Sequence, residues 1–299
     1  MTDQTASASH SSTGPQSSQG DHDSQDAQAI RERLAQVSDT VRSASQAAHG
    51  SADAVRIMLA TKTQPASRIR VALEAGCTLI GENRVQELQT KAPDLADIPH
   101  EPHLIGPLQR NKVNHTLRAG AVCVQSIDNL AVAQRLSNRI ATLLAEGHDS
   151  LVAEAPGTLR AHGTEASGTD GSAAASGTAA ASDTASPLLD VFLQVNTSRE
   201  ESKFGVDPAA AEELATQVRD LSHLRIRGLM TIGLPGSSDD EIRPSYAELR
   251  ELSARLRDTG ALPADATELS MGMSADFGLA IEEGATIVRI GSTVFGARS

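Results

Sequence analysis

The sequence predicts an α/β fold, a single (β/α)8 TIM barrel with an N-terminal helix packing beside strand eight. Short strand-like runs alternate with longer helical patterns along most of the 299 residues, which is typical of a parallel sheet. The strand-like runs number eight, the number that closes such a barrel. A doubly wound open sheet is the rival architecture. The count disfavours it, because an open sheet has no reason to end at eight strands.

Each predicted strand is apolar or alternates between apolar and polar residues. We place the strands at residues 56–62, 78–83, 101–106, 122–127, 189–196, 225–232, 267–272 and 286–292. Three helices begin at recognisable residues. Pro65 opens the helix after the first strand, Asp128 is the expected N-cap of a helix that runs to Leu144, and Pro208 opens the helix after the fifth strand.

The N-terminal helix is expected to complete the outer layer of the barrel. After the eighth strand too few residues remain for a closing helix, whereas residues 27–48 show an amphipathic pattern. The apolar side of that pattern carries Ile30, Leu34, Val37 and Val41. We therefore expect this helix to fill the gap beside strand eight.

Two stretches of the chain are too polar or too simple in composition to form a core. Residues 1–27 are rich in Ser, Gln, Asp, Gly and Thr, and we expect a disordered tail. Residues 147–186 are dominated by Ala, Ser, Gly and Thr, as in a linker between two domains or an insertion within one. The strand and helix pattern resumes after this stretch, which favours one domain over residues 28–299 with an insertion.

Composition excludes several classes of protein. The net charge of -12 and the pI near 5.2 argue against nonspecific binding to nucleic acid or to an anionic membrane. No apolar run approaches the roughly 20 residues of a membrane span, and residues 1–28 lack the apolar core of a signal peptide. We expect a cytoplasmic protein. Cys77 and Cys123 have neither disulfide nor metal-site spacing and are expected to be small buried side chains.

Lys62 is the first candidate functional residue. On the period of two in a strand, it shares a face with Met58 and Ala60. If that face points into the barrel, its amine is partly desolvated, which favours the neutral form that makes a Schiff base with an aldehyde. A strand-end lysine with its ammonium in water is the more ordinary interpretation of this segment alone.

The other strand ends are also polar, and in a parallel barrel they meet at one mouth. The residues at these ends are Lys62, Asn83, His103, Ser126, Asn196, Ser270, Ser274 and Arg289. Residues 270–274 lead into a predicted helix at 275–283, and Gly291, Ser292 and Thr293 end the eighth strand with a small residue and two hydroxyls. These two loops are the usual phosphate site of such barrels, although they could also be ordinary capping loops. The sequence thus predicts a pocket for an anionic ligand.

Arg289 is expected to face the barrel mouth, opposite its apolar neighbours Val288 and Ile290. Its guanidinium stays protonated, so a buried Arg289 needs a hydrogen-bonding or charged partner. That partner is either a carboxylate such as Glu82 or a ring nitrogen or phosphate of a ligand. Three other basic residues have simpler explanations: His103 is a satisfied core or rim histidine, Lys112 belongs to a solvated basic patch, and Lys203 pairs with Glu200 or Glu201.

Seven motifs together resemble the pyridoxal phosphate homeostasis protein family. They are Ala60-Thr61-Lys62-Thr63, Gly81-Glu82-Asn83-Arg84-Val85-Gln86-Glu87, His103-Leu104-Ile105-Gly106-Pro107-Leu108-Gln109-Arg110-Asn111-Lys112, Glu201-Ser202-Lys203-Phe204-Gly205, Arg227-Gly228-Leu229-Met230-Thr231-Ile232, Ser270-Met271-Gly272-Met273-Ser274 and Val288-Arg289-Ile290-Gly291. The resemblance runs from about residue 29 to the end, except for the 147–186 insertion. One departure touches the pocket rim, where Arg84 stands in place of a common aromatic residue.

The resemblance implies a barrel like the N-terminal domain of alanine racemase, with pyridoxal 5'-phosphate (PLP) held covalently as a Schiff base on Lys62. It implies that Arg289 lies near the pyridine nitrogen of PLP. The full set of implied cofactor-binding residues is Lys62, Asn83, Met230, Ser270, Ser274, Arg289, Gly291, Ser292 and Thr293.

The resemblance does not by itself decide between a carrier and an enzyme. Racemisation needs a second base opposite the lysine, and the single tyrosine, Tyr246, is predicted on a helix away from the strand ends, with no second domain after strand eight. An arginine facing the ring nitrogen also weakens PLP as an electron sink. We therefore expect a monomeric, non-catalytic protein that buffers PLP and delivers it to apo PLP-dependent enzymes. The alternatives are a weak amino-acid racemase or related fold-type III enzyme, and a sugar-phosphate enzyme without a Schiff base.

Overall fold

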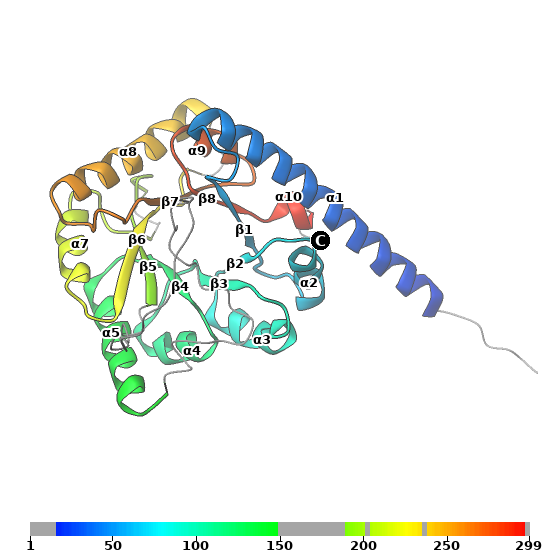
Figure 1. Ribbon diagram of the computed structural model, residues 1–299, viewed down its shortest axis with the longest axis horizontal. Coiled ribbons are helices and arrows are strands. Elements are labelled where there is room, and N and C mark those ends of the chain that lie inside the picture. Colours follow the sequence, from blue (N-terminus) through cyan, green and yellow to red (C-terminus); the bar gives the residue numbers. More distant parts are fainter. Residues whose placement is uncertain (1–15, 149–188, 201–203, 235–237, 297–299) are drawn as a thin grey trace, which may run out of the picture.

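The computed structural model of the chain is a closed barrel of eight parallel strands, and it describes residues 16–148, 189–200, 204–234 and 238–296 (Figure 1). Each strand pairs with the next along the chain, and β8 closes the barrel on β1. The strands are β1 Arg56–Ala60, β2 Leu79–Glu82, β3 Glu101–Leu104, β4 Cys123–Ile127, β5 Leu189–Gln194, β6 Leu224–Met230, β7 Glu268–Met273 and β8 Ile287–Ile290. The predicted (β/α)8 fold is confirmed.

Most strands are shorter than the apolar runs that predicted them. β1 ends at Ala60, two residues before Lys62, because Thr63 adopts a φ of 64° and turns the chain away from the sheet. β8 ends at Ile290, so residues 291–293 do not continue the strand. Lys62 and Gly291 therefore lie in loops at the mouth, where side chains have more freedom than in a ladder.

The helices form the outer layer around the barrel (Figure 1). They are α2 Ala66–Glu74, α3 Val85–Leu95, the 3₁₀ turn η1 Arg110–Lys112, α4 Val113–Arg118, α5 Leu130–Ala145, α7 Ala211–Arg219, α8 Asp239–Asp258, α9 Phe277–Glu282 and α10 Ser292–Phe295. As predicted, α2 follows directly on Pro65.

Two predicted helix starts need correction. The N-cap of α5 is Asn129, whose side chain accepts a hydrogen bond from Val132 N at 3.0 Å, and Asp128 precedes it. α7 begins at Ala211 because the residues after Pro208 first form a turn, in which Ala209 N donates to the Asp207 carboxylate at 2.8 Å. At α5 the side chain of Asn129 thus satisfies a free backbone N–H of the helix, whereas the N-cap of α7, Ala210, makes no such hydrogen bond.

The N-terminal helix α1 spans Gln16–His49 and lies across α2, α9 and α10, which flank the seam between β8 and β1 (Figure 1). Its apolar side, which includes Ile30, Leu34, Val37 and Val41, is buried, and this confirms the predicted placement. The helix begins earlier than residue 27, so residues 16–27 are helical where we expected disorder. A tertiary contact explains part of this difference, since the carboxylate of Asp26 accepts two hydrogen bonds from Arg68 at 2.7 and 2.8 Å.

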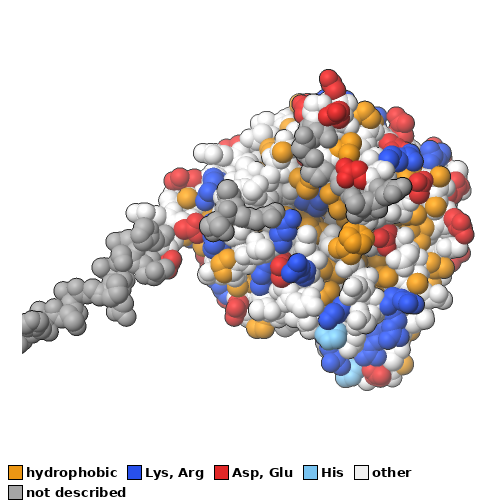
Figure 2. Space-filling model, turned by 180° about the vertical axis from the view of Figure 1, so that it is seen from behind, with side chains coloured by type: hydrophobic (Ala, Val, Ile, Leu, Met, Phe, Trp, Pro, Cys, Tyr) orange, Lys and Arg blue, Asp and Glu red, His pale blue; other side chains and the backbone are white. Residues whose placement is uncertain are grey.

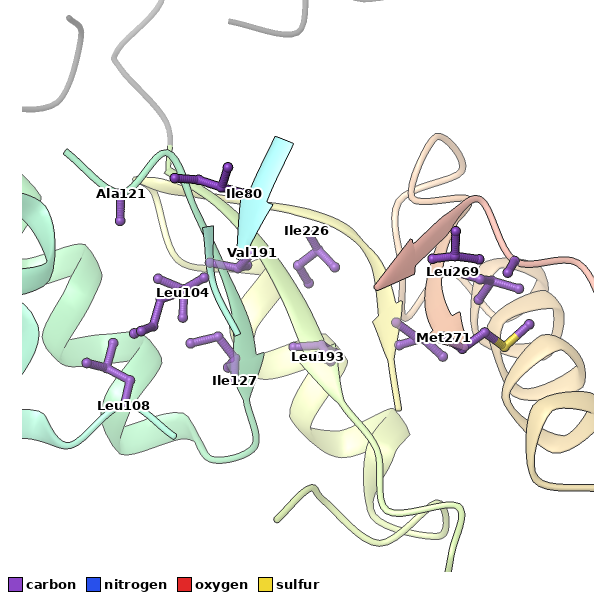
Figure 3. Packing of buried hydrophobic residues seen from close by; sticks show 14 of the residues in the cluster. Ile80, Leu104, Leu108, Ala121, Ile127, Val191, Leu193, Ile226, Leu269 and Met271 are labelled. Carbon is purple, nitrogen blue, oxygen red and sulfur yellow. The ribbon is translucent and has the colours of Figure 1, made fainter. Parts of the chain in front are cut away.

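Buried side chains form two layers on either side of the strands. The inner cluster, which fills the barrel, consists of Met58, Leu79, Cys123, Phe192, Met230 and Ile287. The larger outer cluster lies between strands and helices, and Figure 3 shows a part of it in which Leu104, Ile127 and Val191 come from three neighbouring strands. Cys123 and Cys77 are both free thiols, and burial raises the pKa of Cys77 to about 11. Both are therefore packing residues rather than reactive ones.

Residues 1–15 of the predicted tail, residues 149–186 of the predicted insertion and Lys203 lie outside the described residues. Within the described ranges, no helix is long and apolar enough to cross a membrane.

Candidate functional site

Lys62 lies in the turn between β1 and α2, at the carboxyl end of the barrel. Its side chain is half-buried. Its amine makes no hydrogen bond or ion pair with any residue that the structure describes. Lys91 differs, because its amine lies 2.7 Å from a carboxylate oxygen of Glu82. Lys62 is therefore a lysine that the fold partly shields but leaves without a partner, which is what a covalent attachment point requires.

Arg289 is buried at the end of β8, with 5% of its surface exposed. One terminal nitrogen donates to Ser270 O at 2.7 Å and to Ser270 Oγ at 2.9 Å, and the other donates to Thr231 O at 2.6 Å. Within the described residues no carboxylate pairs with it, and burial lowers its pKa. The suggested pairing with Glu82 is wrong, because the Glu82 carboxylate is held by Thr61 and Lys91 instead. The buried carboxyl of Asp276 acts on Arg289 electrostatically but forms no ion pair with it, so the guanidinium still favours a ligand that can accept hydrogen bonds.

A chain of hydrogen bonds in the barrel interior, on the side away from the mouth, supports Arg289. Ser270 Oγ donates to Gln125 Oε1 at 2.7 Å, and Gln125 Nε2 lies 3.1 Å from His103 Nδ1. All three side chains are buried, which agrees with the interpretation of His103 as a satisfied core histidine. Met230 lies beside Ser270 in the sheet register and belongs to the inner cluster. Ser270 and Met230 are thus brought together one layer below the mouth, in the floor beneath Arg289.

The loops after β7 and β8 meet beside the end of β1. The backbone N–H of Gly291 donates to Ser274 Oγ at 3.1 Å. A Cβ on Gly291 would lie 3.1 Å from Ala60 O, so the β8 loop passes close to the segment that carries Lys62. The hydroxyl residues Ser292 and Thr293 are exposed at the start of α10. Ser274 and Gly291 are thus joined by a hydrogen bond beside the end of β1, and Ser292 and Thr293 follow Gly291 directly in the chain.

Asn83 follows β2 on the other side of Lys62, and its side chain is half-buried. The loop after β3 presses against it, since a Cβ on Gly106 would lie only 2.0 Å from Asn83 O. Only glycine allows this approach, which makes Gly106 a structural requirement of the site that we did not identify from the sequence. Its position inside the third strand-end motif was the available signal.

Tyr246 is nearer to the strand ends than predicted. α8 brings it back to the barrel, where a Cβ on Gly233, in the loop after β6, would lie 2.9 Å from the tyrosine hydroxyl. The prediction that it lies away from the strand ends is therefore wrong. The residue is nevertheless fully buried, and burial raises its pKa.

Lys112 lies in η1, and it makes no ion pair with the described residues. Arg110, His115 and Arg118 on the same segment are exposed. Figure 2, which views the molecule from behind, shows basic side chains and histidine gathered at its lower right, the side on which α4 and α5 lie. This supports the basic patch expected for Lys112. Within the described residues, no group of His, Cys, Asp or Glu side chains could hold a metal ion.

Comparisons with known proteins agree with this geometry. The profile of the alanine racemase N-terminal domain family matches residues 26–299. The pyridoxal phosphate homeostasis protein of Pseudomonas aeruginosa is 37% identical over 269 residues, which cover 90% of this chain and 96% of that protein. The Escherichia coli K12 protein of the same name is 32% identical over 272 residues, covering 90% and 97%.

Solved structures match over similar lengths. A protein of unknown function from Bifidobacterium adolescentis has a TM-score of 0.72 and 32% identity, covering 90% of this chain and 96% of that one. PipY from Synechococcus elongatus with PLP bound has a TM-score of 0.66 and 30% identity, covering 89% and 100%. Alanine racemase from Corynebacterium glutamicum shares the fold at a TM-score of 0.57 and 15% identity, and this chain covers 61% of it. Matches of this identity and length show that the chain belongs to the pyridoxal phosphate homeostasis protein family, whose barrel is that of the alanine racemase N-terminal domain.

Proposed function

We propose that the protein binds PLP at the barrel mouth, with Lys62 as its covalent attachment point, and that it buffers PLP and delivers it to other proteins. One observation carries this proposal: within the described residues, a half-buried lysine without a hydrogen-bond or ion-pair partner lies in the same mouth as a buried arginine that forms no ion pair and a group of hydroxyl and N–H donors. The names of the relatives and the PLP-bound PipY structure support it.

The residues present fit the chemical groups of PLP. The phosphate needs hydrogen-bond donors in a confined space, which the hydroxyls of Ser274, Ser292 and Thr293 would supply, with Gly291 N–H holding Ser274 Oγ. The pyridine nitrogen needs a donor, and Arg289 would supply one, with Ser270 and Met230 in the floor beneath it. The aldehyde of PLP condenses with a lysine amine, losing one water, to form a Schiff base. Lys62 would be that lysine, with Asn83 at the side of the ring.

A carrier explains the site better than a racemase does. Racemisation requires a base on the face opposite the lysine, and the hydroxyl of the chain's single tyrosine, Tyr246, is fully buried with a raised pKa. A permanently charged arginine at the ring nitrogen also disfavours protonation of the ring, which the electron-sink chemistry of PLP enzymes uses. Both features favour holding the cofactor over turning a substrate over.

Borohydride reduction followed by peptide mass spectrometry tests the attachment point. The chain has four lysines, Lys62, Lys91, Lys112 and Lys203, so the assignment is unambiguous. We expect the phosphopyridoxyl adduct on Lys62, and we expect Lys62→Ala to lose both the adduct and the visible absorbance of lysine-bound PLP. Lys112→Ala is the matched control and keeps both. An adduct on Lys203 or Lys112 would overturn the assignment.

Two activity measurements separate the carrier from the enzyme. The loaded protein should restore activity to an apo-aminotransferase faster than the Lys62→Ala protein incubated with the same total PLP. It should not exchange the α-proton of amino acids in deuterated water at enzyme-like rates. Rapid exchange would instead show a racemase or a related PLP enzyme.

A further inference from the structure

A buried charged cluster lies behind Lys62, on the side of β1 and β2 that faces α3 (Figure 1). It consists of Glu82 at the end of β2 and of Glu87 and Lys91 on α3. The Lys91 amine lies 2.7 Å from Glu82 Oε1 and 3.8 Å from Glu87 Oε2. Glu82 is fully buried, and the side chain of Lys91 is 12% exposed. The cluster is outside the barrel mouth, so the proposed cofactor contacts do not account for it.

The cluster holds the residue that precedes Lys62. Thr61 Oγ1 donates to Glu82 Oε1 at 2.6 Å, and the Lys91 amine donates to Thr61 O at 2.9 Å. The backbone N–H of Thr61 donates to Gly81 O at 3.0 Å. Side chain, carbonyl and N–H of Thr61 are therefore all fixed. Thr61 O belongs to the planar peptide bond between Thr61 and Lys62. The cluster therefore fixes the position of the Lys62 backbone nitrogen.

The carboxyl groups of Glu82 and Glu87 interact with each other. Glu82 Oε2 and Glu87 Oε2 are both buried and lack hydrogen-bond partners within the described residues. Burial, and then the interaction with the neighbouring Glu87 carboxyl, raise the pKa of Glu82 to about 7. The charged groups that face Glu82 are Glu87 and Lys91, both from α3, whereas β1 contributes the neutral hydroxyl of Thr61. One proton between the two carboxyl groups would satisfy both orphan oxygens, and its loss would leave two buried negative charges against one ammonium.

We propose that Glu82, Glu87 and Lys91 are positioning residues, which hold the Thr61–Lys62 peptide and thereby set the reactivity of the Lys62 amine in a proton-dependent manner. The inference deepens the proposed function and rests on Lys62 being the attachment point. With the shared proton present, the hydrogen bonds of Thr61 with Glu82 and Lys91 are intact. When the proton is lost, repulsion between the carboxylates loosens that hold and Lys62 reacts less readily.

The test measures Lys62 in the cofactor-free protein. Formaldehyde and cyanoborohydride methylate accessible lysine amines, and mass spectrometry gives the extent at Lys62 relative to Lys112, which is also unpaired within the described residues. We expect Lys91→Met to lower the Lys62:Lys112 ratio, because Thr61 O loses its donor and the surroundings of the Lys62 amine change. A folded Lys91→Met protein with an unchanged ratio would contradict the proposal.

A second variant separates positioning from a merely structural role and keeps the fold. Glu82→Gln imitates the protonated state: its amide oxygen still accepts from Thr61, and its amide N–H₂ can donate to Glu87. The wild-type ratio should fall severalfold between pH 6 and pH 8, whereas the Glu82→Gln ratio should stay constant. Glu283→Gln is the matched control, since Glu283 is also buried but pairs with Arg243 at 2.8 Å on α8. Parallel pH profiles for wild type and Glu82→Gln would overturn the inference.

A PLP titration of the same proteins keeps the two proposals apart. If the wild-type protein binds no PLP while the methylation ratios behave as expected, the proposed function fails and the positioning role stands. If PLP loads on Lys62 and the ratios do not respond to either variant, the positioning role fails and the proposed function stands.

Discussion

At the scale of single residues, partners rather than residue types decide which side chains are available for chemistry. Lys62 and Lys91 are both lysines near the ends of β1 and β2, yet Lys91 is tied to two carboxylates and a carbonyl, and Lys62 has no partner within the described residues. Arg289 is buried like a structural arginine, but its hydrogen bonds go to uncharged groups of Ser270 and Thr231. These differences make Lys62 and Arg289, and not Lys91, the candidates for ligand contact.

Gly106 tests how tightly the loops at the mouth are packed. The Cβ of Gly106→Ala would lie 2.0 Å from Asn83 O, a backbone atom that cannot rotate away. We expect a loss of about 2–3 kcal/mol in the free energy of unfolding, with weaker PLP binding because Asn83 must move. Gly278→Ala is the matched control: its Cβ would meet nothing within 4 Å, and helix α9 should gain about 0.5–1 kcal/mol. Denaturant unfolding measures both, and equal effects would contradict the packing argument.

Glu82 predicts a pH dependence of stability. Its pKa is raised from near 4.5 to about 7 in the folded protein, so the folded state holds the proton more tightly than the unfolded state does. The stabilisation from this proton is complete below about pH 4.5 and is lost as the pH rises through 7. The loss is on the order of 3 kcal/mol, at about 1.4 kcal/mol for each pKa unit.

Glu82→Gln removes this titration. The difference in unfolding free energy between wild type and Glu82→Gln should therefore shift in favour of the variant between pH 5 and pH 8. Thermal or denaturant unfolding at a series of pH values measures the difference. A constant difference across that range would show that Glu82 does not titrate there.

At the scale of elements, the site depends on loops from opposite ends of the sequence. The β8 loop at Gly291 lies against the end of β1 at Ala60 and is bonded to the β7 loop through Ser274. The outer layer closes at the same seam, where α1 covers α2, α9 and α10. Arg68 of α2 joins this layer, because it bonds Asp26 of α1, donates to Phe295 O of α10 at 2.7 Å and lies 5.8 Å from the Phe295 ring centre.

Arg68→Met tests the contribution of this seam. The substitution removes a bidentate ion pair and a hydrogen bond to a carbonyl, and we expect a loss of about 1–2 kcal/mol after allowing for partial exposure. Arg42→Met is the control, since Arg42 and Asp53 form an ion pair whose side chains are 57% and 78% exposed. The control should change stability by less than about 0.5 kcal/mol. Equal losses of unfolding free energy in the two variants would indicate that the Arg68 contacts between α1, α2 and α10 do not stabilise the protein.

At the scale of the whole molecule, closure of the barrel brings segments that are far apart in the sequence into contact. β1 and β8 are paired, with Met58 opposite Arg289. The inner cluster fills the barrel below the mouth, and hydrogen bonds through His103, Gln125 and Ser270 support the arginine from there. The mouth is thus a rigid rim over a packed interior, as is usual for functional sites in this fold.

The surface of the molecule predicts a monomer. Among the described residues, Phe204 is the one large hydrophobic side chain that is exposed, whereas obligate dimers bury extensive apolar surface. Light scattering during gel filtration should give a mass near 31.2 kDa for the full chain. A mass near twice that value, independent of concentration, would contradict the prediction.

The sequence was sufficient for the barrel, the order of its strands and the position of α1, because the period of apolar residues and the count of segments depend on local patterns. It also singled out Lys62 and Arg289 as candidates, since polar residues at the ends of apolar runs can be recognised without coordinates. It did not predict the N-cap at Asn129, the turn after Pro208 or helical residues 16–27, where the competing local and tertiary contacts differ by small energies.

What only the tertiary structure decided is which groups face one another. Three contacts join residues on different elements: Glu82 with Thr61 and Lys91, Gly106 with Asn83, and Tyr246 with the loop after β6. Such contacts depend on register, twist and side-chain direction, which no single segment encodes. The sequence by itself thus determined the fold and singled out a candidate lysine, and the closed barrel decided the surroundings that leave this lysine without a partner among the described residues.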